Sequence, residues 1–578
     1  MGGEALRLNT RRSNGVEYVY FLESYRDPVT KEPRTRTVKS FGRRDVLEAR
    51  DPDIMSKLQA ECDRINAETS TSVEEKLAEL FKKAPADPVC EGLSLKNYGI
   101  FCYRALWNEL SMDVCFRGIQ SLSRSKCDLA RSAFFLSALR NMQPCSKIAS
   151  FRQKDSYLFN FGSLRLDDMY RSLDMFADYK SKIEAHLYKK LFNGEKKNVS
   201  VAFYDVTTYY FESVEADGFR NFGFSKDHRV GEVQVLMGLL IDKCGIPLGY
   251  ELFPGNTSEF KTLLSSLNKL KKQYKVEKVI VVADRGLNSK SNLARIKEMG
   301  FEYVLAFKIR GASDDVKAAV LSKDGFTECL KEDEEDSYRF KVLEHTQVVV
   351  CPDEDGSRNK IYLTDSLIIS YSSKRAEKDA KDRGRLIKKA EKLVGNPSMF
   401  KAELKKGGKS FVAADIDGNS LKLDAAKIAE QSLYDGYYGI LSSDPEISPE
   451  EAVSIHHGLW KIEESFRIMK SGLRSRPCFV WTPEHIKGHF VICYLALVLQ
   501  RLLEKKLKER GIAGSSQAIQ DSLNKANVME LRIKGQIFYA KEKTPKLYDE
   551  IADTLGIAPL RTYSTKTDLQ KHFRHRIS

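Results

Sequence analysis

The strongest constraint on the fold is the alternation of strand and helix patterns that begins near residue 198. Three apolar runs come first, separated by turn-forming residues: 199–207, 233–243 and 248–255. A helical pattern at 258–274 then leads to one more apolar run at 278–283. Strands joined by short turns, followed by a crossover helix and a further strand, predict a mixed sheet on which acids from separate strands can converge.

Two aspartates occur in the same local pattern within this region. Asp205 follows "VAFY" and Asp284 follows "VIVVA", so each is predicted at the end of a buried strand. A carboxylate there is costly to desolvate unless it is paired, hydrogen-bonded or bound to a cation. An Asp at a strand end also caps turns, so either residue alone fits a structural role equally well. The repetition of the pattern favours a shared acidic site.

A third carboxylate is predicted on a helix that begins near residue 449. Ser448 is a suitable N-cap and Pro449 suits the first helical position. An apolar stripe follows at helical spacing: Leu459, Ile462, Phe466, Met469 and Leu473. Glu463, Arg467 and Lys470 share a neighbouring face. The alternative is an ordinary Glu-to-Arg pair on a solvated helix.

Together the three carboxylates predict an oxygen-rich site for divalent cations. Asp205, Asp284 and Glu463 suit Mg²⁺, with Mn²⁺ as a substitute. Two such ions can activate a water or a 3′ hydroxyl and stabilise the leaving oxygen of a phosphodiester displacement. Lys470 and Arg467 would then contact phosphates.

Composition points to a polyanionic partner in a reducing compartment. The 578 residues include 94 Lys and Arg against 80 Asp and Glu, a formal charge of +14. Eleven cysteines are scattered without a CxxC pair, so neither a disulfide framework nor a zinc ribbon is expected. The longest apolar run, 490–499, is too short to span a bilayer and is expected to form a core helix. We therefore expect a cytoplasmic protein with no membrane contact.

The motifs of the chain resemble those of DDE transposases of bacterial insertion sequences, in the group marked by a YREK motif. The resemblance rests on these stretches: "YDVTTYYFE", "QVLMGLL", "GIPLGYELFPGN", "VVADRGLNS" and "LWKIEESFRIMKSGL". In that motif a Tyr and an Arg precede the catalytic Glu by seven and four residues, and a Lys follows it by seven. Glu463 and Lys470 match, whereas His456 and Leu459 occupy the Tyr and Arg positions. The role of the Tyr/Arg pair is therefore open.

The resemblance implies an α/β RNase H-like catalytic core, a mixed sheet flanked by helices, interrupted by a β-rich insertion domain. It implies N-terminal β-rich and helical domains before that core. The expected organisation is as follows: a β-rich then helical DNA-binding region at 1–95, a helical domain at 96–195, the core at 196–310 and 441–510, the insertion at 311–440, and a C-terminal DNA-binding or dimerisation region at 511–578.

The resemblance also implies catalysis and metal binding by Asp205, Asp284 and Glu463. The side chains expected to contact DNA are Lys470, Arg467, Arg285, His456, Lys226, Arg229 and Trp481. The implied partners are double-stranded DNA, both element ends and target, and a second copy of the chain in a homodimeric synaptic complex associated with the nucleoid.

The sequence thus predicts a transposase that binds terminal inverted repeats, cleaves a strand at each element end and joins the freed end to target DNA. Two alternatives remain open. One is an RNase H-like nuclease that cuts without strand transfer. The other is an inactive DNA-binding relative of a transposase.

Overall fold

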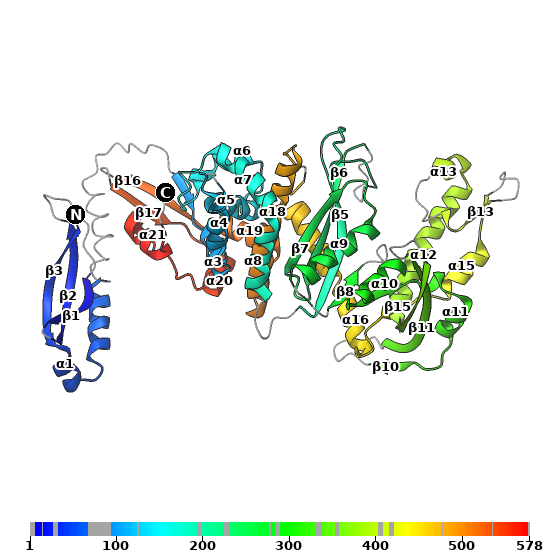
Figure 1. The fold of residues 1–578 in the computed structure, drawn as a ribbon, viewed down its shortest axis with the longest axis horizontal. Coiled ribbons are helices and arrows are strands. Elements are labelled where there is room, and N and C mark those ends of the chain that lie inside the picture. The colour runs from blue at the N-terminus through cyan, green and yellow to red at the C-terminus, as the bar shows by residue number, and fades with distance from the viewer. Residues whose placement is uncertain are drawn as a thin grey trace.

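The computed structural model shows an elongated chain with a three-stranded sheet at one end and the β13–β14 ribbon near the other (Figure 1). It describes residues 6–575 apart from these positions: 14, 27–32, 67–93, 124–125, 193–198, 225–230, 275, 277–278, 284–289, 330–337, 353–357, 403–408, 415–420, 477 and 534–535.

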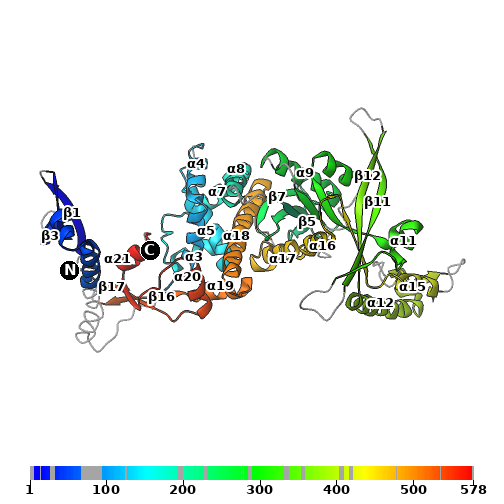
Figure 2. The same cartoon turned by 90° about the horizontal axis from the view of Figure 1, so that it is seen from below.

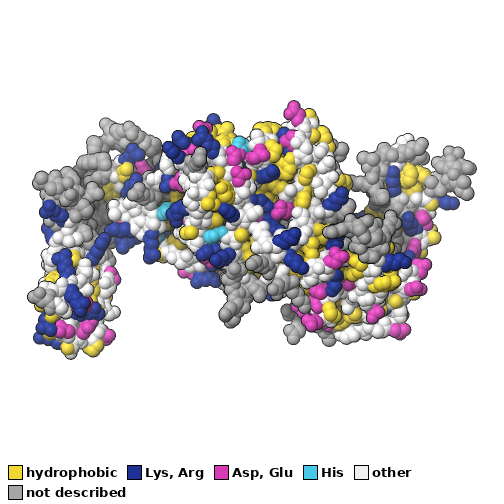
Figure 3. Space-filling view, in the orientation of Figure 1, with side chains coloured by type: hydrophobic (Ala, Val, Ile, Leu, Met, Phe, Trp, Pro, Cys, Tyr) yellow, Lys and Arg dark blue, Asp and Glu magenta, His cyan; other side chains and the backbone are white. Residues whose placement is uncertain are grey.

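The N-terminal unit is an antiparallel sheet packed against helices. Its elements are β1 (Leu6–Ser13), β2 (Val16–Arg26), β3 (Pro33–Arg43), α1 (Arg44–Arg50) and a helical stretch at 54–66. Val19 and Phe21 of β2 are buried together with Leu58 and Cys62 of the helical stretch. The outer strands β1 and β3 carry exposed basic side chains, including Arg11, and Lys and Arg are prominent over this unit in Figure 3.

A helical body follows, and the end of the chain returns to complete it. Its helices are α3 (Ile100–Glu109), α4 (Met112–Gln120), α5 (Leu129–Met142), α6 (Lys147–Arg152), α7 (Leu166–Asp178) and α8 (Lys180–Phe192). The returning elements are α18 (Pro483–Glu509), α19 (Ser516–Asn524), β16 (Asn527–Ile533), β17 (Gln536–Lys541), α20 (Lys546–Thr554), β18 (Tyr563–Thr565) and α21 (Lys566–Phe573). β4 (Ser94–Asn97) joins the two halves by pairing with β16.

Helix α18 is long and apolar enough to cross a membrane by length and composition, but 89% of its most apolar window is buried inside the protein. It packs against α5 and α7. The expectation of a core helix over residues 490–499 is therefore confirmed, because the apolar surface of α18 is covered by protein on nearly every side.

The largest sheet has nine strands in the order β10-β11-β12-β15-β9-β8-β5-β6-β7. Its first part contains β5 (Val201–Tyr210), β6 (Gln234–Asp242), β7 (Pro247–Pro254), β8 (Ile280–Ala283) and β9 (Glu302–Phe307). β5, β8 and β9 are parallel, whereas β5, β6 and β7 form an antiparallel meander. Helices α9 (Glu259–Lys272) and α10 (Lys290–Glu298) cover one face of the sheet. The mixed sheet predicted for this region is confirmed.

The residues between the core strands and the next helices extend the same sheet. β10 (Thr327–Cys329), β11 (Tyr338–Pro352), β12 (Arg358–Ser372) and β15 (Tyr437–Ser442) continue it past β9. The long β11–β12 hairpin projects beyond the rest of the sheet (Figure 2). Beside it lie α11 (Asp314–Leu321), α12 (Ser373–Val394), α13 (Pro397–Ala402), α15 (Ala425–Ser432) and the ribbon of β13 (Val412–Ala414) and β14 (Leu421–Leu423).

The prediction of a single helix from residue 449 to 473 is wrong in one respect, because the structure divides this segment. It forms α16 (Pro449–His457), α17 (Trp460–Arg467) and a π-helical turn at Ile468–Gly472. Ser448 is the N-cap as predicted, and its hydroxyl accepts the Glu451 N–H at 3.1 Å. The break falls at Gly458, which lies so close to the Phe203 ring of β5 that a Cβ there would be 2.5 Å from Phe203 Cζ.

Candidate active site

Asp205 lies within β5 and not just past the end of a strand, which corrects the sequence-based expectation. β6 pairs with β5 as far as Tyr210, so the strand continues beyond Asp205. The alternation of side chains places Asp205 on the face of Phe203 and Tyr209, opposite the face covered by α9. The carboxylate is half-buried, and its Oδ1 accepts the N–H of Val206 at 2.7 Å.

The described part of β8 ends beside Asp205. Tyr204 and Ala283 are register partners in the parallel pair of β5 and β8. The next residue along each strand is one of the two predicted aspartates. Asp284 and Arg285 themselves lie outside the described residues, as do Lys226 and Arg229.

Helix α17 runs alongside β5 on the face that carries Asp205. Gly458, just before the helix, contacts Phe203, and Met469, just after it, accepts a hydrogen bond from the Tyr209 hydroxyl at 3.7 Å. Helix and strand therefore run in the same direction. Because Asp205 is nearer in β5 to Phe203 than to Tyr209, it faces the first turn of α17, which carries Glu463. Glu463 is exposed, whereas Ile462 and Phe466 are buried against the sheet.

The two predicted phosphate-binding cations lie at different places around the helix. Lys470 is in the π-helical turn, with its ammonium 5.8 Å from the centroid of the Tyr209 ring. Arg467 is exposed, and its guanidinium is 3.4 Å from the carboxylate of Glu464. π-turns inside α-helices occur frequently at functional sites, because they change the direction in which following side chains project.

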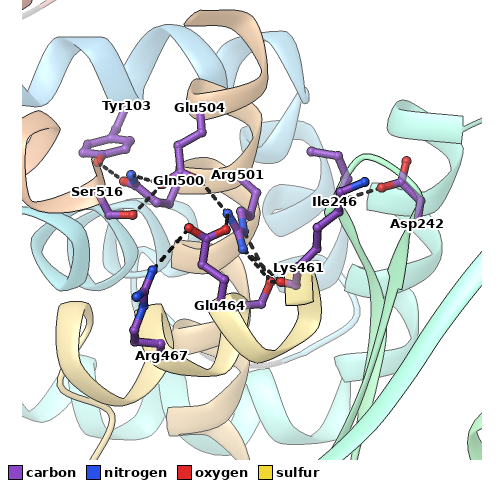
Figure 4. Close-up of polar contacts among 11 residues, drawn as sticks. Tyr103, Asp242, Ile246, Lys461, Glu464, Arg467, Gln500, Arg501, Glu504 and Ser516 are labelled. Carbon is purple, nitrogen blue, oxygen red and sulfur yellow. Dashed lines mark hydrogen bonds and ion pairs between the residues drawn. The ribbon is translucent and has the colours of Figure 1, made fainter. Parts of the chain in front are cut away.

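Arg501 of α18 holds α17 in place, and sequence reasoning missed it. Its guanidinium pairs with Glu464 at 2.9 Å and Glu504 at 2.8 Å. It also donates to the Lys461 carbonyl at 3.1 Å and to the Ser465 hydroxyl at 2.9 Å. Figure 4 shows Arg501 between Glu464 and the backbone of Lys461. One buried side chain thus fixes the rotation of the two-turn helix α17. Glu463 directly precedes Glu464 in this helix, so its direction is fixed as well.

A second buried cluster holds the end of the π-helical turn. Arg140 of α5 donates to the carbonyls of Leu473 and Arg474, both at 3.3 Å. The Lys147 ammonium donates to His489 Nδ1 at 2.9 Å, so the neutral imidazole carries its proton on Nε2 and donates to the Ser475 carbonyl at 3.3 Å. Burial, assisted by the charge of Arg140, lowers the pKa of Lys147 to about 8. Burial also holds the pKa of His489 well below its usual value.

His456 and Trp481 differ in exposure. His456 is buried at the end of α16, and its Nε2 is 3.4 Å from the Tyr438 hydroxyl of β15. The Arg375 guanidinium of α12 lies 4.3 Å from the centroid of the Tyr438 ring. Trp481 is half exposed, with the Arg220 guanidinium 5.8 Å from its ring centroid.

Among the residues that the structure describes, no three His, Cys, Asp or Glu side chains are grouped closely enough to hold a metal ion. Of the three predicted ligands, Asp205 and Glu463 are among these residues, whereas Asp284 lies outside them.

Family models match both parts of the chain that carry these features. A transposase DDE domain model matches residues 200–499, and a model of the IS1634 family transposase N-terminal domain matches residues 6–76. The first match covers the nine-stranded sheet, α16, α17 and the first part of α18. The chain therefore belongs to the transposase DDE domain family. It is an insertion-sequence transposase, an enzyme that cleaves and transfers DNA.

No curated protein matches the chain. Similar solved structures include two transposase complexes. One is a piggyBac transposase synaptic complex with hairpin DNA, at 10% identity over 74% of this chain and 79% of that one, with a TM-score of 0.35. The other is a Mos1 transposase paired-end complex with the left transposon end, at 17% identity over 42% of this chain and 71% of that one, with a TM-score of 0.14.

Proposed function

We propose that Asp205, Asp284 and Glu463 form the catalytic centre of this transposase and that they bind Mg²⁺, with Mn²⁺ as a substitute. The observation that carries the proposal is the alignment of Asp205 with the turn of α17 that bears Glu463, next to the end of β8. All three donors are carboxylates, which suit hard divalent cations. Members of the DDE family generally use such ions.

The strand order β7-β6-β5-β8-β9, with β5 parallel to β8, supports an RNase H-like core. Within it, β10 to β15 and their helices form the β-rich insertion, which shares the sheet of the core and extends its edge. We assign the insertion to residues 311–440 and the two parts of the core to 196–310 and 441–510.

In the proposed reaction, the chain positions the scissile phosphate between the carboxylates and the cations of the catalytic helix. Asp205, Asp284 and Glu463 would hold the divalent ions, which would supply activation of the attacking hydroxyl or water and stabilisation of the leaving oxygen. Lys470 holds a phosphate oxygen from the π-helical turn, and Arg467 contacts the next phosphate along the strand. Arg285, Lys226 and Arg229 add contacts to the flanking duplex.

We further propose that the basic outer strands of the N-terminal sheet, within residues 1–95, bind the terminal inverted repeats. The helical domain at 96–195 connects this region to the core, and residues 511–578 contribute to DNA binding or dimerisation. Trp481, half exposed beside Arg220, stacks on an unpaired base, and His456 supports the site through Tyr438. The functional unit is a homodimer that holds two element ends in the cytoplasm at the nucleoid.

The experiment incubates the purified protein with labelled DNA carrying the ends that flank its own gene, in Mg²⁺ or Mn²⁺. Asp205→Asn, Asp284→Ala and Glu463→Gln are compared with Asp553→Asn, a matched change at a carboxylate that is 79% exposed on α20. Cuts at the element boundary and joined products are expected from the wild type and Asp553→Asn, and neither product from the other three variants.

Two results would overturn the proposal in different ways. Cleavage without joined products in the wild type would identify a nuclease that does not transfer strands. Binding of the ends by all proteins, with no cleavage by any of them under conditions that allow end pairing, would identify an inactive DNA-binding relative.

A further inference from the structure

A groove of about 1010 Å³ lies on the side of α17 that faces away from the sheet. One wall is a stripe of the catalytic helix and the π-helical turn that includes Trp460, Arg467 and Ser471. These residues recur at helical spacing, so they project from one face. The opposite wall is the last part of α18, with Lys505 and Lys508.

The floor of the groove is apolar and the walls carry cations. Ile468, Leu507 and Ile512 lie at the floor, and the Trp460 side chain is 55% exposed in the wall. Two of the lining carboxylates, Glu464 and Glu504, are turned toward the buried Arg501 and pair with it, as Figure 4 shows. Arg467, 3.4 Å from Glu464, supplies a second guanidinium, so the two carboxylates are balanced by two cations of the protein.

The remaining charge of the lining is predominantly positive. The lining cations other than Arg501 and Arg467 are Lys243, Lys461, Lys505 and Lys508, and the remaining carboxylate is Glu509, 3.8 Å from the Lys505 ammonium. The turn that carries Lys243 is held by Asp242, whose Oδ1 accepts the N–H groups of Cys244 and Ile246. The groove thus presents a positive potential on a fixed frame.

The groove begins beside the proposed catalytic residue. Arg467 lies one helical turn after Glu463, so a nucleic-acid strand that leaves Glu463 along α17 enters the groove directly. An exposed indole, an apolar floor and flanking cations are the combination by which proteins bind unpaired strands, since bases stack on the aromatic ring while phosphates meet the cations.

We propose that this groove binds single-stranded DNA adjacent to the cut site, with Trp460 stacking on a base and Lys505 and Lys508 contacting phosphates. The inference rests on the proposed function for the position of the cut site. It goes beyond that function because it assigns a further binding site to the side of α17 that faces away from the sheet.

The test measures binding of a short fluorescent oligonucleotide of mixed sequence, as a single strand and as a duplex, over a range of salt concentrations. The variants are Trp460→Ala and the double variant Lys505→Glu, Lys508→Glu. Lys546→Glu, on α20 with a lysine that is 91% exposed, is the matched control. Thermal unfolding of each variant verifies that it folds.

We expect single-strand affinity to fall about tenfold in Trp460→Ala, because the variant loses the stacking of a base on the indole. In the double variant the slope of log affinity against log salt is expected to decrease by about 0.7 for each phosphate that the protein no longer neutralises. Lys546→Glu is expected to bind like the wild type. If folded groove variants bind the single strand as tightly as Lys546→Glu, the proposal is wrong. A larger loss of duplex than of single-strand binding would identify a duplex site instead.

Cys244 provides a direct probe of occupancy, because it lines the groove and is exposed. Saturating single-stranded oligonucleotide is expected to slow alkylation of Cys244 severalfold, and unchanged alkylation would contradict the proposal. Asp205→Asn separates this inference from the proposed function: it is expected to lose cleavage and to keep protection of Cys244. Failure of cleavage in the wild type would therefore leave the groove assay interpretable.

Discussion

The two ends of the segment formed by α17 and the π-helical turn are anchored by buried cations in opposite electrostatic settings. At α17, Arg501 is 8% exposed and faces two carboxylates, Glu464 and Glu504. At the π-helical turn, Arg140 and Lys147 are equally buried, but their partners among the described residues are backbone carbonyls and the neutral His489. One anchor is a cation that two carboxylates surround, and the other is an excess of positive charge.

From this difference we predict how the protein responds when the cation of each anchor is removed. Removing the cation from the first anchor leaves two partly buried carboxylates without the cation they share, which is strongly destabilising. Removing a buried cation that is not paired with a carboxylate removes the free-energy cost of keeping that charge out of water, but it also breaks the hydrogen bonds of the cation. The two ends of this segment are therefore expected to react differently to the same kind of substitution.

The largest effect is expected for Arg501→Met. Glu464 and Glu504 would lose their common partner, so the free energy of unfolding should fall by about 3 to 5 kcal/mol, and DNA cleavage should fall with it. Denaturant unfolding and the cleavage assay measure the two effects. Arg510→Met removes a half-exposed arginine that pairs with Asp553 and should cost less than about 1 kcal/mol. Equal losses of stability in both variants would contradict the anchoring role of Arg501.

Lys147→Met tests the unbalanced anchor through its pH dependence. Burial puts the folded-state pKa at about 8, below the ordinary value of 10.5, so between these values the unfolded state binds more protons. Stability of the wild type relative to Lys147→Met should therefore rise with pH across that window, by roughly 3 kcal/mol in total, since one pKa unit is about 1.4 kcal/mol.

Unfolding free energies of both proteins at several pH values between about 7 and 11 measure this difference. A pH-independent difference would show that Lys147 titrates as an ordinary lysine and that the anchor at the π-helical turn is solvated.

Gly458→Ala should have an intermediate effect, because the added Cβ would lie 2.5 Å from Phe203 Cζ where α17 meets β5. We expect a cost of about 1 to 3 kcal/mol and reduced cleavage, since the helix must shift relative to Asp205. Gly384→Ala in α12 is the control, because no atom lies within 4 Å of its Cβ position and helix propensity favours Ala. Unchanged stability and cleavage in Gly458→Ala would argue against a tight helix-to-strand register.

The smallest effect on stability is expected for Arg467→Ala. Its side chain is 74% exposed and its pair with Glu464 lies at the surface, so the change should be below about 0.5 kcal/mol. DNA affinity should nevertheless fall, because the proposed role of Arg467 is to bind a phosphate. Thermal unfolding and DNA binding, measured on the same preparation, separate the two. A large loss of stability would place Arg467 within the Arg501 anchor.

Much of the catalytic core could be predicted from the chain alone. The apolar runs at 199–207, 233–243 and 248–255 became β5, β6 and β7, and the pattern at 258–274 became α9. The N-cap at Ser448 was also predictable, because a cap depends on residues within one turn. The distance of Asp205 from the end of β5 was not predictable, because pairing with β6 extends the strand to Tyr210, beyond the end of the local run at residue 207.

The periodic elements, the residue types of the candidate site and the family could be inferred from the chain alone, because local spacing and motifs carry that information. The break between α16 and α17 and the buried charges that hold α17 depend on the tertiary structure. Arg501 meets Glu464 across 37 residues, and Lys147 meets His489 across 342. Such partners are selected by packing between distant segments, and a buried charge acquires its energetic meaning only from the groups that surround it.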